Sequence, residues 1–170
     1  MSAVSSDEDS FIEDITKAKK QALYYLKFRA RSSAEMRRYL NRKGHSSTVQ
    51  EEVVTWLQEL GYIDDLQFSL QWIENRCRTN PMGERRLVQE LYQKGIPQSV
   101  IDQAMVTFRE TVDETALACK LATDRVRVYQ GEDIDATKRK LAGFLGRRGF
   151  RLDDIRFAIH QVLGREQGSS

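Results

Sequence analysis

One short pattern occurs three times in the chain, and this repetition constrains the fold more than any other feature. The pattern is a leucine, two further residues, a basic residue and a glycine, and it spans Leu40–Gly44, Leu91–Gly95 and Leu145–Gly149. It is typical of a helix end: the leucine packs inward, the basic side chain lies where the helix dipole is negative, and the glycine takes the left-handed C′ conformation. Each copy therefore predicts a corner between two helices.

The three corners are almost evenly spaced. Gly44, Gly95 and Gly149 lie 51 and 54 residues apart, and a period of this size is typical of a tandem array. A single Leu-x-x-Lys-Gly could end any helix. Three copies, each followed by another amphipathic segment, favour a repeat of about fifty residues.

Apolar residues at helical spacing surround every corner, and no segment has the alternation of a strand. The chain of 170 residues contains only two prolines, which also favours helix. We expect nine helices in three sets of three, with an all-α fold of three tandem three-helix repeats forming an elongated, curved helical array. The expected divisions are an acidic disordered tail (1–9), three repeats (10–63, 64–110 and 111–165) and a frayed C-terminus (166–170).

Helix starts are predicted from capping residues. Four capping boxes are expected, at Ser10 with Glu13, Ser32 with Glu35, Thr48 with Glu51, and Thr111 with Glu114. Acidic caps are expected at Asp64 or Asp65, at Asp133 or Asp135, and at Asp153 and Asp154.

Signatures of catalysis are missing from the sequence. It contains neither common phosphate-binding glycine loop and no Gly-x-Ser-x-Gly. Of its two histidines, His45 is expected to be exposed in a turn, and His160 to pack beside an apolar stripe. Cys77 and Cys119 are isolated and are interpreted as small buried hydrophobic residues. The sequence therefore predicts no enzyme, no catalytic residue, no metal ligand and no cofactor.

The sequence also predicts a location. No apolar run approaches the roughly 20 residues of a membrane span, and the acidic N-terminus lacks the pattern of a signal peptide. We therefore expect a cytoplasmic protein that does not contact a membrane and is a monomer.

Charge is segregated along the chain although the net charge is only +2. Residues 1–14 carry −5, residues 17–43 carry +9, and residues 44–75 contain six acids and no base. Such blocks predict basic and acidic faces, and a polyanion is the natural partner of a basic face. The alternative is a solvated surface that only confers solubility.

The candidate contact residues are basic side chains that recur beside equivalent corners. Nearby aromatic residues (Tyr24, Tyr25, Phe28, Tyr39 and Phe150) could stack on bases, although core packing explains most of them better. The candidates are Lys20, Lys27, Arg31, Arg37, Arg38, Arg42, Lys43, Arg76, Arg78, Arg85, Arg86, Lys94, Lys138, Arg139, Lys140, Arg147, Arg148 and Arg151.

Two motifs carry a family resemblance. The connector Gly61-Tyr-Ile-Asp-Asp65, followed by Phe68, resembles the Gly-Tyr-Leu-Asp-Asp-x-x-Phe of the RecX family, bacterial regulators of the recombinase RecA. Ile63 replaces the usual leucine, and Pro81-Met82 interrupts a stretch that is commonly richer in glycine and basic residues. A second family motif is matched by Gly83, Arg86, Leu87, Glu90, Leu91, Lys94, Gly95 and Ile96.

The resemblance implies three three-helix repeats, no enzymatic activity, and binding to the RecA–DNA filament. Binding in the filament groove, or blocking of filament growth, would inhibit ATP hydrolysis, strand exchange and co-protease activity. The implied partners are the RecA filament, single-stranded DNA and double-stranded DNA, in the setting of homologous recombination and the SOS response. Two alternatives stay open: a general nucleic-acid-binding helical repeat without recombinase specificity, and a purely structural scaffold.

Overall fold

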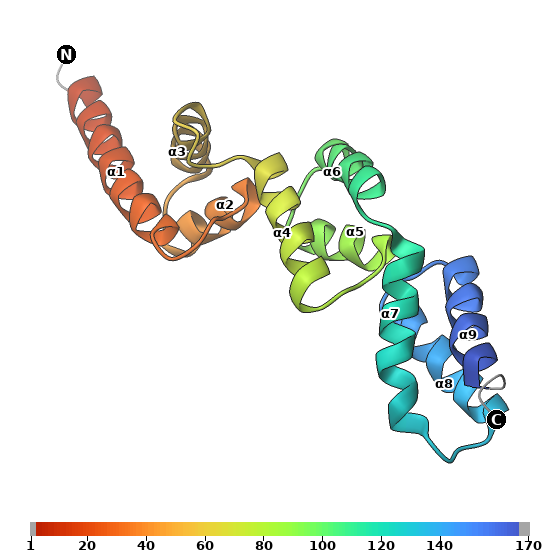
Figure 1. Ribbon diagram of the computed structural model, residues 1–170. Coiled ribbons are helices and arrows are strands. Elements are labelled where there is room, and N and C mark those ends of the chain that lie inside the picture. The colour runs from red at the N-terminus through yellow and green to blue at the C-terminus, as the bar shows by residue number, and fades with distance from the viewer. Residues whose placement is uncertain (1–2, 167–170) are drawn as a thin grey trace.

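The computed structural model describes residues 3–166, and within them the chain forms nine α-helices, one short 3-10 helix and no strand. Figure 1 shows the helices in three successive groups along an elongated, curved molecule, which confirms the predicted fold class. The helices are α1 (Ala3–Leu26), α2 (Ser33–Arg42), α3 (Ser47–Glu59), α4 (Asp65–Thr79), α5 (Glu84–Gln93), α6 (Gln98–Thr111), α7 (Glu114–Val126), η1 (Arg127–Tyr129), α8 (Ile134–Arg147) and α9 (Leu152–Glu166).

Each group of three helices has its own hydrophobic core. The first core is drawn from α1–α3 and the following connector, the second from α4–α6, and the third from α7–α9. The three corner leucines, Leu40, Leu91 and Leu145, are fully buried, one in each core. The middle helix of each group therefore anchors the corner that ends it.

The corners have the predicted geometry. Gly44, Gly95 and Gly149 have φ angles of 88°, 77° and 84°. In each corner the amide after the glycine donates to the carbonyl of the leucine, at 3.2, 3.2 and 3.3 Å in chain order. The glycine amide donates three residues back, so all three corners are Schellman motifs.

Neighbouring repeats are joined by one kind of contact. The corner of each repeat docks on the start of the middle helix of the repeat before it. At the first junction, Ser32 Oγ donates to the Lys94 carbonyl at 2.9 Å. At the second, the Gly83 amide donates to the Arg148 carbonyl at 2.8 Å. The C-terminal end of α5 thus meets the N-terminal end of α2, and α8 meets α5 in the same way, so the helix dipoles run head to tail.

A carboxylate strengthens each junction. Asp65 Oδ1 accepts from the Ser33 amide at 2.8 Å, and Glu114 Oε1 accepts from the Glu84 amide at 3.2 Å. Ser33 and Glu84 are the first residues of α2 and α5, whose amides a helix cannot satisfy internally. The next repeat therefore supplies an acceptor for the first amide of α2 and of α5.

The N-terminus differs from the sequence prediction. Helix α1 begins at Ala3, so residues 3–9 are helical rather than a disordered tail, and Ser10 lies inside the helix instead of capping it. Extension of an existing helix is far easier than nucleation of a new one, and serine, aspartate and glutamate tolerate it. At the other end, Glu166 belongs to α9, and the predicted frayed residues 167–170 lie outside the described residues.

Several predicted helix starts are confirmed. Ser32 and Glu35 form a complete capping box. Asp64 accepts from the Gln67 amide at 2.9 Å, and Asp133 accepts from the amides of both Asp135 and Ala136 at 3.1 Å.

Other predicted starts are wrong by two or three residues. The cap of α3 is Ser46 instead of Thr48, because Thr48 already lies within the helix. The cap of α7 is Asp113, since α6 continues to Thr111. Asp153 and Asp154 lie in the first turn of α9 rather than at its cap. In the first turn their negative charges still interact favourably with the positive end of the helix dipole.

We predict that docking, and not only backbone conformation, makes glycine necessary at the second corner. A Cβ added to Gly95 would overlap the Cβ of Ala34, whereas nothing lies within 4 Å of a Cβ added to Gly44. Gly44→Ala should cost about 1–2 kcal/mol for its left-handed conformation. Gly95→Ala should cost about 1–3 kcal/mol more because of the clash, as measured by urea unfolding.

Removal of the opposing methyl group provides the control. Ala34→Gly in the Gly95→Ala background should recover part of the loss, with a coupling energy of at least about 0.5 kcal/mol. Equal costs for the two glycine substitutions, without coupling to Ala34, would contradict the docking argument.

Candidate polyanion-binding surface

The junction between the first two repeats contains a cleft of about 480 Å³ that we call the first junction cleft. Four predicted contact residues, from two helices and a corner, meet in it, although the chain separates them by up to 56 residues. They stand beside two aromatic rings and two carboxylates. The cleft is lined by Tyr25, Glu35, Arg38, Arg42, Trp72, Arg76, Glu90, Gln93 and Lys94.

Trp72 organises two of the cations. The Arg76 guanidinium and the Lys94 ammonium each lie 4.6 Å from the centre of the indole ring. Glu90 accepts from Arg76 Nε at 2.8 Å and from the indole N–H at 3.0 Å. Cation–π contact therefore holds both charges in a defined place at the wall of the cleft, and the Glu90 carboxylate also fixes Arg76.

Glu35 anchors the opposite wall. It pairs with Arg29 at 2.9 Å and with Lys94 at 3.3 Å, and it accepts from the Ser32 amide at 3.3 Å. Burial alone would raise the pKa of Glu35, but the hydrogen bond and charge of Arg29, the Ser32 amide and Lys94 together lower it. Glu35 therefore stays ionised and joins the first repeat to the second.

The two remaining arginines of this cleft lie one turn apart on α2. Arg38 donates to the carbonyls of Ala34 and Lys94, both at 3.3 Å. Arg42 is exposed on the last turn of the helix. Because these contacts leave both charges unneutralised, the cleft offers guanidinium groups to an external anion.

A similar cleft lies at the second junction. This second junction cleft has a volume of about 410 Å³ and brings together three more predicted residues, Arg85, Arg86 and Arg147. Arg86 donates to Gln89 at 2.9 Å, whereas Arg85 and Arg147 are exposed. Its remaining lining residues are Gln89, Ala142, Gly146, Gly149, Phe150, Leu152 and Ile155.

Three predicted residues make ion pairs or hydrogen bonds within the protein itself. Arg37 pairs with Glu51 at 2.6 Å and thereby lowers the pKa of that carboxyl. Lys140 pairs with Glu132. Arg148 donates to Asn80 and to the Pro81 carbonyl across the second junction.

The other candidates lie outside both junction clefts. The Arg31 guanidinium stacks 3.8 Å from the centre of the Tyr25 ring, and Lys138 and Arg139 line a third cavity within the third repeat. The rest are exposed side chains: Lys20, Lys27, Lys43, Arg78 and Arg151.

The aromatic candidates divide in two. Tyr25 and Tyr39 stack on each other with centroids 4.0 Å apart, and Phe150 is buried in the third core. Tyr24 and Phe28 are 62% and 65% exposed, with their rings edge to face at 5.2 Å. Only the latter pair presents open ring surface to a base.

The structure corrects the interpretation of both histidines. His45 is only 4% exposed, with Nδ1 2.7 Å from Asp14 and Nε2 2.8 Å from Gln21, because the long helix α1 passes over the first corner. His160 is exposed rather than packed. Cys77 and Cys119 are half-buried rather than fully buried, and burial raises the pKa of the Cys77 thiol.

Sequence reasoning missed Trp72, Glu35 and Glu90 as components of the first junction cleft. The spacing of Trp72 and Arg76 by four residues was the available signal, because such residues face the same way on a helix. Nothing in the spacing shows that Glu35 meets Lys94, 59 residues away.

Residues 3–166 contain neither a metal-binding cluster nor a helix suited to a membrane. No group of three or more histidine, cysteine, aspartate or glutamate side chains is arranged to hold a metal ion. No helix in the same range combines the length and apolar character required to cross a bilayer.

Three family models match the chain in order. They are the first, second and third three-helix domains of RecX, and they match residues 18–57, 64–105 and 113–159. Together the matches cover most of the chain, one in each group of helices.

Curated relatives and solved structures agree with these matches. The regulatory proteins RecX of Pelodictyon phaeoclathratiforme and Prosthecochloris aestuarii are 32% and 33% identical over 84% and 88% of this chain, and 86% and 96% of their own length. The chain spans 59% of the longer Bacillus licheniformis relative. The crystal structure of RecX from Lactobacillus salivarius matches with a TM-score of 0.79 at 21% identity, over 89% of this chain and 97% of that one.

We predict opposite pH effects for two junction carboxylates. Glu35→Gln should destabilise the protein at neutral pH by about 1–2 kcal/mol, because its charge-assisted hydrogen bonds are lost. Since the pKa of Glu35 is lowered on folding, its contribution is present above about pH 4.5 and is lost as the pH falls through the lowered pKa. Urea unfolding should show the difference from wild type shrinking as the pH falls below about 4.5.

Glu114→Gln is the matched control at the second junction. Burial, followed by the charges of Asp154 and Glu84, raises the pKa of Glu114 despite its hydrogen bond from the Glu84 amide. An uncharged amide oxygen can accept the same bond, so this variant should be neutral or stabilising above the raised pKa and lose that advantage below it. Destabilisation of equal size by both variants at neutral pH would contradict this assignment.

Proposed function

The chain belongs to the RecX family, and we propose that it is a non-enzymatic regulator that binds the RecA–DNA filament. On this proposal it lies in the filament groove, or blocks filament growth, and inhibits ATP hydrolysis, strand exchange and co-protease activity. It acts in the cytoplasm, in homologous recombination and the SOS response, and contacts single-stranded and double-stranded DNA as well as the recombinase.

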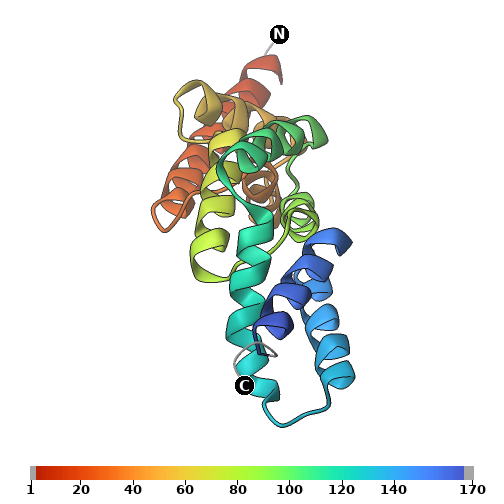
Figure 2. The ribbon, with the colours of Figure 1, turned by 45° about the vertical axis from the view of Figure 1, so that its right-hand side comes forward.

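The observation that carries the proposal is the repetition of an arginine-lined cleft at both junctions of an elongated body. Figure 1 shows the three groups as successive bodies along one path, and Figure 2, rotated from that view, shows the third group extending away from the first two. Because both clefts are made by equivalent docking contacts, their spacing is fixed by the repeat. A periodic surface of this kind suits a periodic partner such as a filament, in which successive subunits present the same anionic groups.

Two sets of contacts are expected. The free arginines of the junction clefts are suited to carboxylates of the recombinase or to DNA phosphates, and Tyr24 and Phe28 offer ring faces to unpaired bases. The acidic stretch 51–65 is available for basic recombinase surfaces.

A general nucleic-acid-binding function is the second candidate, and the exposure of Tyr24 and Phe28 favours it. Titration of the protein into filament ATPase assays at fixed recombinase separates the two. Inhibition at protein concentrations well below those that saturate free DNA supports filament recognition, whereas inhibition only at DNA saturation supports the second candidate.

We predict that reversing cleft charges weakens inhibition. The variant Arg42→Glu/Arg85→Glu/Arg147→Glu changes exposed arginines of both junction clefts. Loss of three contacts worth about 0.5 kcal/mol each should raise the half-inhibitory concentration roughly tenfold.

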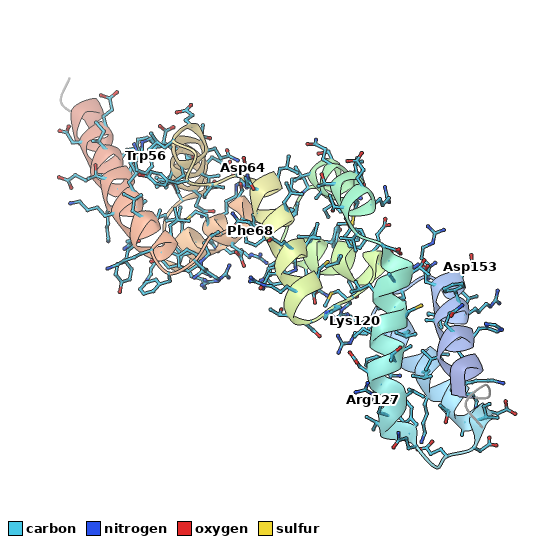
Figure 3. All side chains as sticks on the ribbon, viewed as in Figure 1. Trp56, Asp64, Phe68, Lys120, Arg127 and Asp153 are labelled. Carbon is cyan, nitrogen blue, oxygen red and sulfur yellow. The ribbon has the colours of Figure 1, made fainter. Side chains whose placement is uncertain are left out.

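The matched control reverses the same number of charges outside the clefts. Lys17→Glu/Lys120→Glu/Arg127→Glu changes exposed residues on α1, α7 and η1, two of which are marked in Figure 3. It should inhibit like wild type within about twofold, and circular dichroism should show equal helix content for both variants. Equal loss of inhibition in the two variants would mean that net charge, and not the clefts, determines binding.

A further inference from the structure

A pocket in the third repeat takes no part in the contacts proposed so far. It lies between α8 and α9 and, at about 550 Å³, is larger than either junction cleft. We call it the third-repeat pocket. Among the described residues it is lined by Ile134, Lys138, Arg139, Ala142, Arg156, Ile159, His160, Leu163 and Gly164.

The chemistry of this pocket suits one kind of ligand. Its apolar surface comes from Ala142, Ile159 and Leu163, and basic side chains stand around it. Lys138 and Arg156 make only exposed pairs within one turn of their own helices, at 3.3 and 3.9 Å, and such pairs compete weakly with an external partner. An acidic amphipathic helix carries apolar side chains flanked by carboxylates. It would therefore fill the apolar surface of the pocket and pair with the basic side chains around it.

The chain itself carries such a helix at its other end. The segment 8–13 of α1, which we call the acidic segment, presents three exposed carboxylates, Glu8, Asp9 and Glu13. Between them Phe11 and Ile12 are 41% and 60% exposed. Neither belongs to the first core, in which the α1 contacts start at Ile15.

We infer that the acidic segment of one molecule docks in the third-repeat pocket of a second copy. Figures 1 and 2 place the N-terminal end of α1 and the α8–α9 pair at opposite ends of the molecule, so the two surfaces of one chain do not meet. The contact is therefore intermolecular and joins the head of one molecule to the tail of the next. A contact of this type joins two different surfaces, so each added copy leaves a free surface for the next, and the series grows beyond a dimer.

The contact is weak for isolated molecules. The acidic segment is less than two helical turns long and buries far less than the roughly 1,200 Å² of a stable interface, so dilute protein is monomeric. On a filament, neighbouring copies are held close together, and an effective concentration in the millimolar range would make the same contact cooperative. The inference extends the proposed function but does not need it, because the contact forms between copies of the free protein.

Sedimentation velocity without recombinase or DNA tests the inference, from about 10 µM to about 1 mM protein. Wild type should show an average mass that rises with concentration. The head variant Phe11→Ser/Ile12→Ser and the pocket variant Arg139→Glu/Arg156→Glu should each remain monomeric over this range.

The decisive sample is an equimolar mixture of the two variants. The head variant keeps an intact pocket and the pocket variant keeps an intact acidic segment, so one contact can form between them and no second one can follow. The mixture should therefore form a dimer that grows no further, whereas wild type continues to larger species.

A control variant removes exposed apolar surface elsewhere. Tyr92→Ser/Val128→Ser changes residues of α5 and η1 that are more exposed than Phe11, and it should associate like wild type. A wild type that stays monomeric at the highest concentration, a head variant that associates like wild type, or a mixture that stays monomeric would each overturn the inference. Because recombinase is absent, none of these results bears on the junction clefts.

Discussion

The structure depends on one contact made twice: the carbonyl at the end of a middle helix accepts a hydrogen bond from the start of the middle helix before it. The Lys94 carbonyl accepts from Ser32, and the Arg148 carbonyl accepts from Gly83. The approach is close because a glycine follows each carbonyl and has no Cβ. End-to-end docking of α8, α5 and α2 then sets the path of the whole molecule, and α1, α3, α4, α6, α7 and α9 pack around this axis.

The same contact determines where charge accumulates. A basic residue favours the last turn of a helix for local electrostatic reasons, and docking brings that turn beside the arginines of the preceding repeat. Lys94 consequently joins Arg38 and Arg42 in the first junction cleft. Glu35 and Glu90, which are largely buried, offset part of this charge and hold the walls together. A junction that is required for folding thereby also creates the surface that we assign to binding.

Sequence reasoning was reliable wherever the controlling forces are local. The corner glycines, the buried leucines and the Ser32 capping box were all predictable, because each depends on residues within one or two turns. Contacts between repeats were not predictable from spacing. Two examples are the hydrogen bond from the Ser33 amide to Asp65 and the burial of His45 beneath α1. Both depend on how the helices pack in space. Of the eighteen basic residues proposed from the sequence, seven meet in the junction clefts. Three others, Arg37, Lys140 and Arg148, make ion pairs or hydrogen bonds within the protein.

The acceptor at each junction belongs to the main chain, and this has an evolutionary consequence. A carbonyl is the same whether its residue is Lys94 or Arg148, so the side chains around a corner can change without loss of the joint. Many surface residues can therefore be substituted while the junction between repeats persists, provided that the glycine and a small opposing group remain. Substitutions at the surface alone can therefore adapt such a protein to changes in the surface of its partner.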